Sequence, residues 1–201
     1  MPFLILARHG ESTFNLENRF TGWIDVPLTE KGKEEARAIA RKIAGYRIDK
    51  AYSSSLQRTV ESLQIVLKEL HCENIPAVHS TELNERHYGD IQGLNKTETA
   101  TRYGESLVHE WRRSYTVAPP GGESLKDASE RILSFLDLRI FEDVRSGNNV
   151  LVVAHGNTLR AIVKRLDHLT DKEIMDLNIA TGEVLVYEFN ISLLMTGKTK
   201  L

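Results

Sequence analysis

The sequence predicts an α/β fold in which a mostly parallel central sheet lies between two layers of helices, a three-layer α/β/α arrangement. Two apolar strands, at 3–7 and 149–154, each lead into a His-Gly pair, at His9-Gly10 and His155-Gly156. Short strands alternate with amphipathic helices between them, which is typical of a parallel sheet covered on both faces. Such sheets bind ligands at the carboxyl ends of their strands, so we expect the active site at that C-terminal edge.

The elements of the first half are predicted from hydrophobic periodicity. The run from Phe3 to Ala7 is short, apolar and followed by polar residues, as in a buried strand. A polar loop over 11–28 leads to a helix at about 29–44, with Thr29 as its cap and Gly45 as its stop. Three further elements follow: a strand at 48–53, a helix at 56–70 and a strand at 77–80.

Between Glu82 and Gly122 the periodicity degrades, and we expect a cap inserted over the sheet edge at about 82–122. Short helices are predicted inside it, near 96–103 and 105–113. Regular elements then return: a helix at 125–145, the second His-Gly strand at 149–154, a helix at 157–166, a short helix at 171–177 and a strand at 183–189. The tail, 190–201, gives little signal and is expected to be mobile.

Length and composition indicate one domain, spanning 1–201. A chain of 201 residues that is 41% hydrophobic can bury a full core, and its net charge of −2 gives no reason to expect nucleic acid or an anionic membrane as a partner. The single cysteine, Cys72, cannot form an internal disulfide, which fits a reducing compartment. No apolar run has the length of a membrane span and no signal peptide is evident, so we expect a cytoplasmic location.

Polar side chains follow several predicted strands and would meet at one edge of the sheet. They are Arg8 and His9 after the first strand, Arg58 in the helix after the second, Glu85 and Arg86 after the third, and His155, Gly156 and Asn157 where a strand joins a helix N-terminus. Arginines and a helix N-terminus favour an anion. The sequence therefore predicts a site of anion size with two histidines, two arginines and one carboxylate, and phosphate is its natural occupant.

Such a site is suited to phosphoryl transfer. A neutral imidazole nitrogen is a competent nucleophile, and arginines supply positive charge around the equatorial oxygens without a metal. A neighbouring carboxylate could exchange the proton of the attacking or leaving hydroxyl. The sequence has no P-loop, and its seven histidines and one cysteine show no metal-ligand spacing, so we expect no metal.

Other polar and aromatic residues have no functional signal in their spacing alone. Lys96 is typical of a solvated helix residue, and Arg112-Arg113 occupy adjacent helix positions that do not share one face. Trp23 and Trp111 are interpreted as packing residues. The remaining candidates are assigned to structure or surface: His71, His79, His109, His168 and Cys72.

Several stretches resemble a known family. The sequence Leu-Ala-Arg-His-Gly-Glu at 6–11 and the pair His155-Gly156 are similar to the two histidine motifs of the histidine phosphatase superfamily. Within it, the chain most resembles the 2,3-bisphosphoglycerate-dependent phosphoglycerate mutases. The stretches that carry this closer resemblance are 17–23, 83–89, 92–96, 111–113 and 154–158, and the likeness covers about 4–189.

The resemblance implies a role for individual residues. His9 would be phosphorylated, with Arg8, Arg58 and His155 around the transferring group, and Glu85 would be the general acid and base. The implied substrate-binding residues are Ser12, Asn15, Thr21, Gly22, Arg86, His87, Tyr88, Lys96, Arg112, Arg113, Gly156 and Asn157. Among them Tyr88, Lys96, Arg112 and Arg113 would bind the carboxylate and the phosphate that is not transferred.

The implied reaction interconverts 2-phosphoglycerate and 3-phosphoglycerate in glycolysis and gluconeogenesis, through phospho-His9 and a 2,3-bisphosphoglycerate intermediate. Trace 2,3-bisphosphoglycerate would prime the enzyme as the phosphoryl donor, and no metal is implied. The expected partners are small-molecule phosphoglycerates, and the resemblance suggests a homodimer or homotetramer of a phosphoglycerate mutase-like fold.

The sequence departs from the family in three places. Thr13-Phe14 replaces a glutamine-tryptophan pair, the tail is short, and Pro119-Pro120 leads directly into Gly121–Ser124 where longer mutases carry another segment. Because a wetter site loses phosphoryl groups to water, we expect mutase activity with some phosphatase leakage.

Four alternatives stay open at this point. The Gly-Gly-Glu-Ser turn at 121–124 is similar to phosphatase branches of the superfamily, so a phosphomonoesterase that uses the same phosphohistidine is the main alternative. A bisphosphoglycerate synthase/phosphatase differs only in relative rates. A silent binding module is disfavoured because the catalytic set is present, and a metal-using mutase would need a ligand cluster that the sequence lacks.

Overall fold

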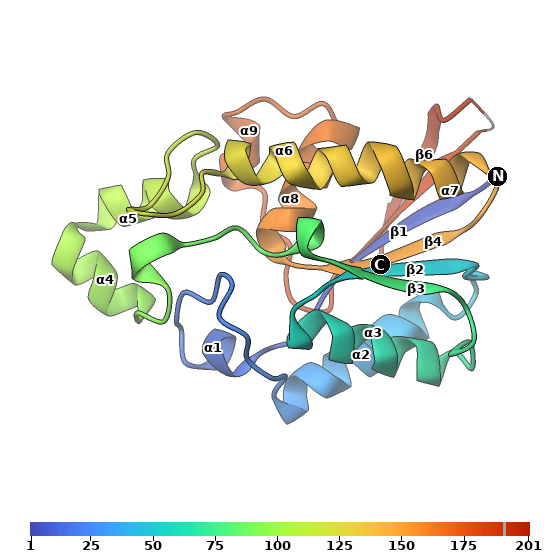
Figure 1. Ribbon diagram of the computed structural model, residues 1–201, viewed down its shortest axis with the longest axis horizontal. Coiled ribbons are helices and arrows are strands. Elements are labelled where there is room, and N and C mark those ends of the chain that lie inside the picture. The colour runs from blue at the N-terminus through green and yellow to red at the C-terminus, as the bar shows by residue number, and fades with distance from the viewer. Residues whose placement is uncertain (191) are drawn as a thin grey trace.

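A six-stranded sheet forms the centre of the computed structural model, which describes residues 1–190 and 192–201 (Figure 1). Its strand order is β3-β2-β4-β1-β5-β6. The strands are β1 (Phe3–Arg8), β2 (Lys50–Ser54), β3 (Ala77–Ser80), β4 (Val150–Ala154), β5 (Val184–Phe189) and β6 (Met195–Lys200). The first four are parallel to one another, and β5 and β6 are antiparallel to their neighbours. The predicted mostly parallel sheet is therefore confirmed.

The central strands β1 and β4 are buried on both faces of the sheet. Leu4 and Leu6 pack into one apolar cluster, whereas Ile5 and Ala7 pack into another on the opposite face. Every residue of β4 is buried. Continuous apolar runs are what a parallel strand between two helical layers requires, which explains why these two strands were recognisable without alternation.

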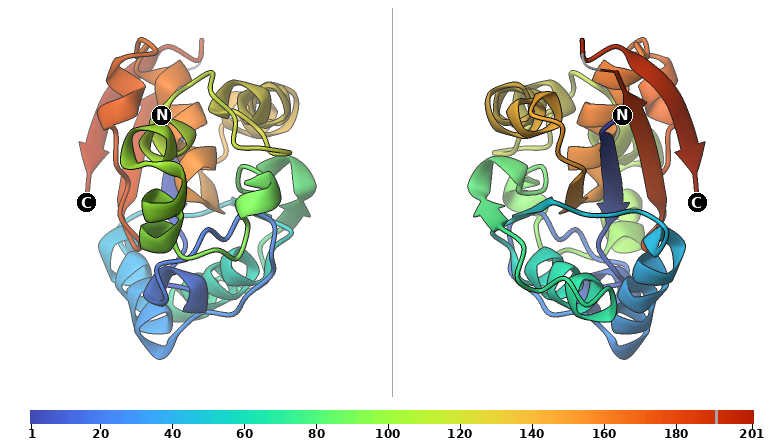
Figure 2. Two further views of the ribbon diagram at one scale, coloured as in Figure 1. Left: turned by 90° about the vertical axis from the view of Figure 1, so that its left-hand side faces the viewer. Right: turned by 90° about the vertical axis from the view of Figure 1, so that its right-hand side faces the viewer.

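Helices cover both faces and complete the three layers (Figures 1 and 2). On one side α2 (Glu30–Ile43) and α3 (Gln57–Glu69) pack through Ile39 and Leu63 against Ile5 and Ala7. On the other side lie α6 (Leu125–Phe135), α7 (Phe141–Arg145), α8 (Gly156–Leu166) and α9 (Glu173–Asp176). Thr29 caps α2 as predicted, because its side chain accepts a hydrogen bond from Gly32 N at 3.0 Å.

The predicted cap folds beyond the carboxyl ends of the strands. It contains α4 (Lys96–Tyr103) and α5 (Glu105–Arg113), at the left of Figure 1, within a residue of the predicted bounds. A small core of its own, built from Phe20, Ile91, Val108 and Trp111, stabilises it. Trp111 is buried there, which agrees with its interpretation as a packing residue.

Three local features differ from the sequence prediction. A short helix, α1 (Thr13–Leu16), lies inside the predicted polar loop. The predicted helix at 125–145 is interrupted by a π-helical stretch, Leu136–Ile140, between α6 and α7. The tail at 190–201 is expected to be mobile and no strand is predicted in it, yet β6 forms at Met195–Lys200 and pairs with β5. Most residues of β6 are exposed, so its strand is held by backbone hydrogen bonds and leaves no hydrophobic pattern to recognise.

Candidate active site

Adjacent strands deliver His9 and His155 to the same point of the sheet edge. β1 and β4 pair in parallel up to Arg8 and Ala154, and the His9 main-chain N–H donates to the Ala154 carbonyl at 3.0 Å. Both side chains are buried, and their ring centroids lie 5.0 Å apart with an interplanar angle of 68°. The structure thus brings together the two histidines that the sequence singled out.

The surroundings of His9 fix its tautomer and its charge. Its Nδ1 lies 2.6 Å from the Gly10 carbonyl oxygen, and because a carbonyl only accepts, Nδ1 carries the proton and donates it. Nε2 therefore keeps its lone pair. Burial, together with the positive charges of Arg58 and Arg8, lowers the pKa of His9 well below its usual value. The result is a neutral imidazole with a free nitrogen, which is the form that attacks phosphorus.

His155 is also held neutral. Its Nε2 lies 2.7 Å from the Ser54 hydroxyl at the end of β2. Burial and the charge of Arg58 lower the pKa of His155 well below its usual value. Its Nδ1 is buried and has no partner among the described residues, so it remains available to a bound group.

Two arginines place positive charge beside the histidines. Arg58, on α3, is buried and donates to the carbonyls of Gly22 and Ile24 at 2.8 and 3.2 Å. Burial lowers its pKa to about 10, which leaves it charged at neutral pH. Arg8 donates through Nη1 to the Ile179 carbonyl at 2.5 Å, and its buried Nε–H has no acceptor in the described part of the chain.

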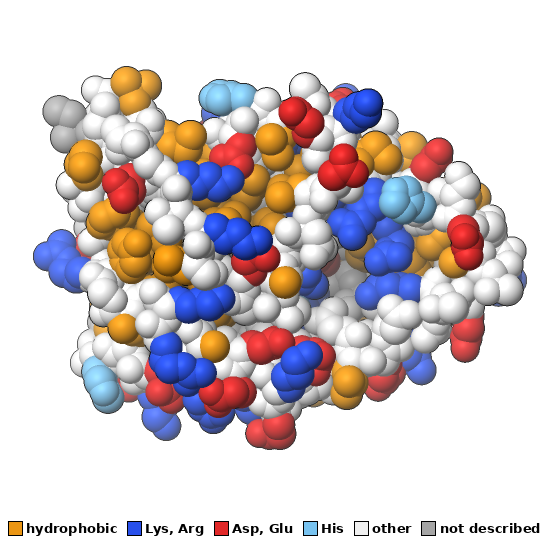
Figure 3. Space-filling model, turned by 180° about the vertical axis from the view of Figure 1, so that it is seen from behind, with side chains coloured by type: hydrophobic (Ala, Val, Ile, Leu, Met, Phe, Trp, Pro, Cys, Tyr) orange, Lys and Arg blue, Asp and Glu red, His pale blue; other side chains and the backbone are white. Residues whose placement is uncertain are grey.

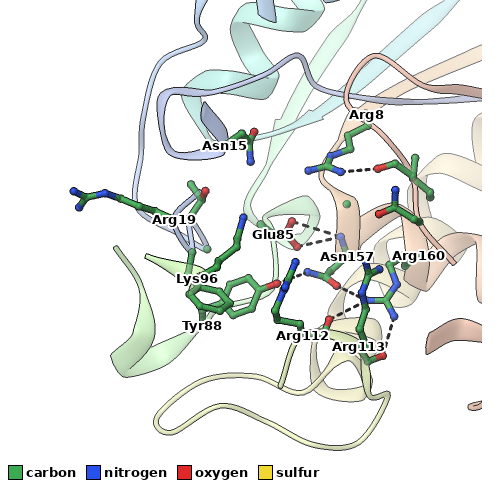
Figure 4. A pocket seen from close by; sticks show the side chains of 16 residues that line it. Arg8, Asn15, Arg19, Glu85, Tyr88, Lys96, Arg112, Arg113, Asn157 and Arg160 are labelled. Carbon is green, nitrogen blue, oxygen red and sulfur yellow. Dashed lines mark hydrogen bonds between the residues drawn. The ribbon is translucent and has the colours of Figure 1, made fainter. Parts of the chain in front are cut away.

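Glu85 is oriented by backbone groups at the start of α8. Its Oε1 accepts from Asn157 N at 3.2 Å and from Arg86 N at 2.8 Å. Its carbonyl oxygen accepts from Trp23 Nε1 at 2.6 Å and from Arg131 Nη2 at 3.0 Å. Both ends of this residue are thus fixed, and the carboxylate lies in the middle of the cavity (Figure 4).

A second group of cations lines the same cavity from the cap. Lys96 lies at the start of α4 and Arg112 and Arg113 at the end of α5, and Tyr88 stands beside them (Figure 4). Burial lowers the pKa of Lys96. In Figure 3 a dense group of Lys and Arg side chains borders a hollow on the cap side of the molecule. The cavity therefore has positive charge at two ends and one carboxylate between them.

Most residues of the predicted site line this cavity. They are Arg8, Asn15, Thr21, Gly22, Glu85, Tyr88, Lys96, Arg112, Arg113, Gly156 and Asn157. His9, Arg58 and His155 are buried and are not among its lining residues.

Three predicted substrate-binding residues make other contacts instead. Ser12 is the N-cap of α1, and its hydroxyl donates to Asn15 Oδ1 at 3.0 Å. Arg86 is fully buried with its guanidinium carbon 4.6 Å from the centroid of the Tyr88 ring. His87 packs against Trp23, and its Nδ1 accepts from the Gly89 N–H at 3.0 Å. In this arrangement they support the cavity wall and do not line it.

The structure adds lining residues that the sequence analysis did not select. They are Arg19, Phe20, Arg160, Asn178 and Ile179. Arg160 lies three residues after Asn157 on α8, so its place on the same helix face was a usable signal. Asn178 and Ile179 lie in a loop after α9, where no periodicity marks them.

Residues 1–190 and 192–201 have neither a cluster of metal-ligating side chains nor a helix suited to crossing a membrane. Within these ranges no group of three or more His, Cys, Asp or Glu side chains is placed to hold a metal ion. No helix in them combines the length and the apolarity that crossing a membrane requires.

Comparison with known proteins agrees with this site. The family model for the histidine phosphatase superfamily (branch 1) matches residues 4–192. A 2,3-bisphosphoglycerate-dependent phosphoglycerate mutase of Methylobacterium radiotolerans is 49% identical over 200 residues, covering 98% of this chain and 94% of the relative. Mutase 2 of Lactiplantibacillus plantarum is 45% identical over 228 residues, covering 100% and 99%. The chain therefore belongs to the histidine phosphatase superfamily and, within it, to the family of these mutases.

Solved structures share the fold. A phosphoglycerate mutase from Bacillus anthracis superposes with a TM-score of 0.82 at 25% identity, covering 100% of this chain and 91% of the other. A mycobacterial glucosyl-3-phosphoglycerate phosphatase in complex with VO3 has a TM-score of 0.84 at 24% identity, covering 100% and 97%. Mutases and phosphatases thus share this scaffold, so the function has to be argued from the site.

Proposed function

We propose that this protein interconverts 2-phosphoglycerate and 3-phosphoglycerate through a phosphohistidine at His9. The observation that carries the proposal is the cavity with cations at both ends. One end is lined by Arg8, close to the buried, neutral His9 and to Arg58, and the other is lined by Lys96, Arg112 and Arg113. A phosphomonoesterase needs only the first end, whereas a substrate with a second anionic group uses both.

The transfer to His9 follows from its tautomer. Nε2 attacks the phosphorus atom, an N–P bond forms, and the bond from phosphorus to the substrate oxygen breaks. Arg8 and Arg58 stabilise the charge on the equatorial oxygens, and His155 offers its free Nδ1 side of the ring beside them. The hydrogen bond from Nδ1 to the Gly10 carbonyl stabilises the positive charge that develops on the ring.

Glu85 is placed to move the proton. As a carboxylate it takes the proton of the free substrate hydroxyl that attacks primed phospho-His9, which frees the imidazole and forms 2,3-bisphosphoglycerate. As the resulting acid it protonates the other oxygen when the phosphoryl group on that oxygen passes to His9, which releases the isomer and restores phospho-His9. The hydrogen bonds from the Asn157 and Arg86 N–H groups keep the carboxylate directed into the cavity through both steps.

The same residues suit 2,3-bisphosphoglycerate, whose dependence is part of the relatives' names. The buried and unpartnered Arg8 Nε and His155 Nδ1 favour a phosphate at the histidine end, and the cap cations favour a second one. When bound, this compound would supply the phosphoryl group that primes His9. No metal enters the proposed steps. A homodimer or homotetramer and a cytoplasmic location stay predictions.

Phosphorus NMR of purified protein with 3-phosphoglycerate and a chelator tests the proposal. We expect 2-phosphoglycerate to form at a rate that depends on trace 2,3-bisphosphoglycerate. Inorganic phosphate without any isomer would contradict the mutase function and favour a phosphomonoesterase. A minor phosphate signal beside the isomer would be the predicted leakage.

The shorter loop after Pro120 does not by itself favour the phosphomonoesterase. The L. plantarum relative aligns over 228 positions, more than the 201 residues of this chain, so it carries additional residues. The M. radiotolerans relative aligns over 200 positions and also bears the mutase name. Relatives of both lengths therefore have the same name.

A further inference from the structure

Arg160 is a buried cation in the cavity wall for which the proposed reaction has no use. It lies on α8 and is 4% exposed. Its Nη1 donates to Asn157 Oδ1 at 2.7 Å and to the Arg112 carbonyl at 3.4 Å. Its Nη2 donates to the carbonyls of Arg113 and Ile174 at 2.9 and 2.7 Å. In Figure 4 its guanidinium lies beside Asn157, Arg112 and Arg113.

These hydrogen bonds occupy the terminal donors of Arg160 within the protein. A guanidinium has four terminal N–H bonds, and each has an acceptor within the protein. The remaining Nε–H is buried and has no partner among the described residues. Burial lowers the pKa of Arg160 to about 10, so it is still charged at neutral pH. Its position therefore argues for a role exerted through its neighbours.

One set of neighbours is the last turn of α5. Helix ends leave their final carbonyls without intrahelical partners, and a cation there also complements the helix dipole. Arg160 supplies donors to the carbonyls of Arg112 and Arg113, whose side chains enter the cavity. Arg160 thereby ties the cap to α8, the helix that begins immediately after His155.

The other neighbour is the Asn157 amide. Because its Oδ1 accepts from Arg160, its Nδ2 must point the other way, where it donates to the Tyr88 hydroxyl at 3.1 Å. The main-chain N–H of Asn157 holds Glu85. Arg160 thus fixes the orientation of the Asn157 side chain. Asn157 contacts Glu85 through its main chain and Tyr88 of the cap through its amide.

We propose that Arg160 is a positioning residue that sets the affinity for the part of the substrate that is not transferred. It holds Arg112, Arg113 and the Asn157–Tyr88 pair at a fixed distance from the histidines. It makes no hydrogen bond to His9, Arg8 or Arg58. The inference rests on the proposed function only in the choice of phosphoglycerate as the ligand.

Calorimetric titration with two ligands tests this role. Orthovanadate probes the histidine end alone, whereas 3-phosphoglycerate needs both ends. For Arg160→Lys and Arg160→Gln we expect the Kd of 3-phosphoglycerate to rise about tenfold or more, and the Kd of orthovanadate to change less than about twofold. The matched control is Arg165→Lys on the same helix, an exposed arginine paired with Asp137, which should change neither.

Adding Arg160→Lys to a variant that already lacks the Arg112 and Arg113 side chains shows whether Arg160 acts through those residues. In Arg112→Met/Arg113→Met the two cations of α5 are gone while Lys96 and the Asn157–Tyr88 pair remain, so adding Arg160→Lys should raise the Kd of 3-phosphoglycerate by clearly less than it does in the wild-type background. Residues that act in series are non-additive in this way, whereas a direct ligand of the substrate keeps its full effect. A full tenfold effect in this background would overturn the proposal.

The remaining outcomes are equally decisive. Equal loss of both ligands in both Arg160 variants would assign Arg160 to the fold as a whole and overturn the proposal, as would an unchanged Kd for both. Wild-type protein that binds orthovanadate and not 3-phosphoglycerate would contradict the proposed function itself. Failure of the Arg160 proposal would therefore appear in the Arg160 variants, whereas failure of the proposed function would appear in the wild-type protein.

Discussion

The reactivity of His9 depends on contacts that a histidine in water does not have. An exposed imidazole exchanges between tautomers and is partly protonated near neutral pH. Here the Gly10 carbonyl selects the Nδ1–H tautomer, and burial beside Arg58 and Arg8 keeps the ring neutral. The arginines that we propose to hold the phosphoryl group thus also keep the His9 imidazole neutral before that group arrives.

At the same scale, the choice of substrate separates the proposed catalytic role of Glu85 from that of His9. We expect Glu85→Gln to lower kcat for phosphoglycerates by about 10²- to 10⁴-fold, because the leaving oxygen then has no acid to protonate it. A phosphate ester with a strongly acidic leaving group, such as p-nitrophenyl phosphate, needs no such proton. Its rate of phosphoryl transfer to His9 should fall less than about tenfold.

The rate with p-nitrophenyl phosphate is measured as a burst of p-nitrophenol, and the rate with phosphoglycerates is measured as isomer formation. Lys126→Gln is a suitable control, because Lys126 is exposed on α6 and does not line the cavity. Equal losses for both substrates would contradict an acid–base role for Glu85 and assign it to positioning of the phosphate.

How much of the site can be read from the sequence differs from residue to residue. His9 and His155 follow apolar strands, so their meeting was predictable from the spacing. Arg112 and Arg113 were assigned to the site by resemblance alone, because adjacent helix positions point about 100° apart. They reach one cavity because they end α5, where the cavity borders the helix terminus. Arg160 acts through carbonyls distant in sequence, which no local pattern reveals.

At the scale of elements, Gly89 joins the cap to the turn at 119–122. Its φ of 55° is left-handed, and a Cβ there would lie 2.0 Å from the Pro120 carbonyl oxygen. Gly89→Ala should lower the free energy of unfolding by roughly 2–5 kcal/mol, from backbone strain and from the clash together. Because Tyr88 precedes this turn, the Kd of 3-phosphoglycerate should rise as well. Urea unfolding and calorimetry measure the two effects.

Gly147→Ala tests the effect of backbone strain at a position where the added methyl group causes no steric clash. Gly147 has a φ of 89° and no atom within 4 Å of the added carbon, and it lies before β4, away from the cavity. We expect this variant to lose roughly 1–3 kcal/mol of stability and to bind 3-phosphoglycerate like the wild type. Equal binding by both variants would show that the contact between Gly89 and Pro120 does not position the cap.

Helices and strands were predictable where buried apolar residues recur at regular intervals along the chain. The stripe of α6 continues through Leu136, Ile140 and Val144, all fully buried, so the pattern looked like one helix. A π-helical stretch changes the hydrogen bonding and not the hydrophobicity, and the sequence therefore hides it. β6 is the opposite case, with a clear ladder to β5 and almost no burial.

At the scale of the whole molecule, charge is distributed unevenly. The net charge is −2, yet the cavity collects Arg8, Lys96, Arg112, Arg113 and Arg160 around one glutamate. None of these five cations has a carboxylate within ion-pair distance among residues 1–190 and 192–201. A local positive potential of this kind attracts multiply charged anions while the surface as a whole does not.

Stability should depend on pH because two histidines fold in their neutral form. Burial beside Arg58 holds the pKa of both His9 and His155 well below 6.5 in the folded protein. In the unfolded chain both titrate near 6.5. Below that pH the unfolded state binds more protons, so the free energy of unfolding falls as pH decreases. We expect little change from pH 8 to 7 and a progressive loss of stability below pH 6.5, with a slope of at most about 1.4 kcal/mol per pH unit for each histidine.

Urea unfolding at fixed pH values measures this slope, and a variant isolates its origin. His9→Gln/His155→Gln has no histidine to protonate at the site, so its stability should be nearly independent of pH between 6.5 and 5. His109→Gln, an exposed position on α5, should keep the wild-type slope. A slope that survives in the double variant would place the pH dependence elsewhere. A slope that disappears would mean that the buried imidazoles of His9 and His155 limit the stability of the whole fold in acid.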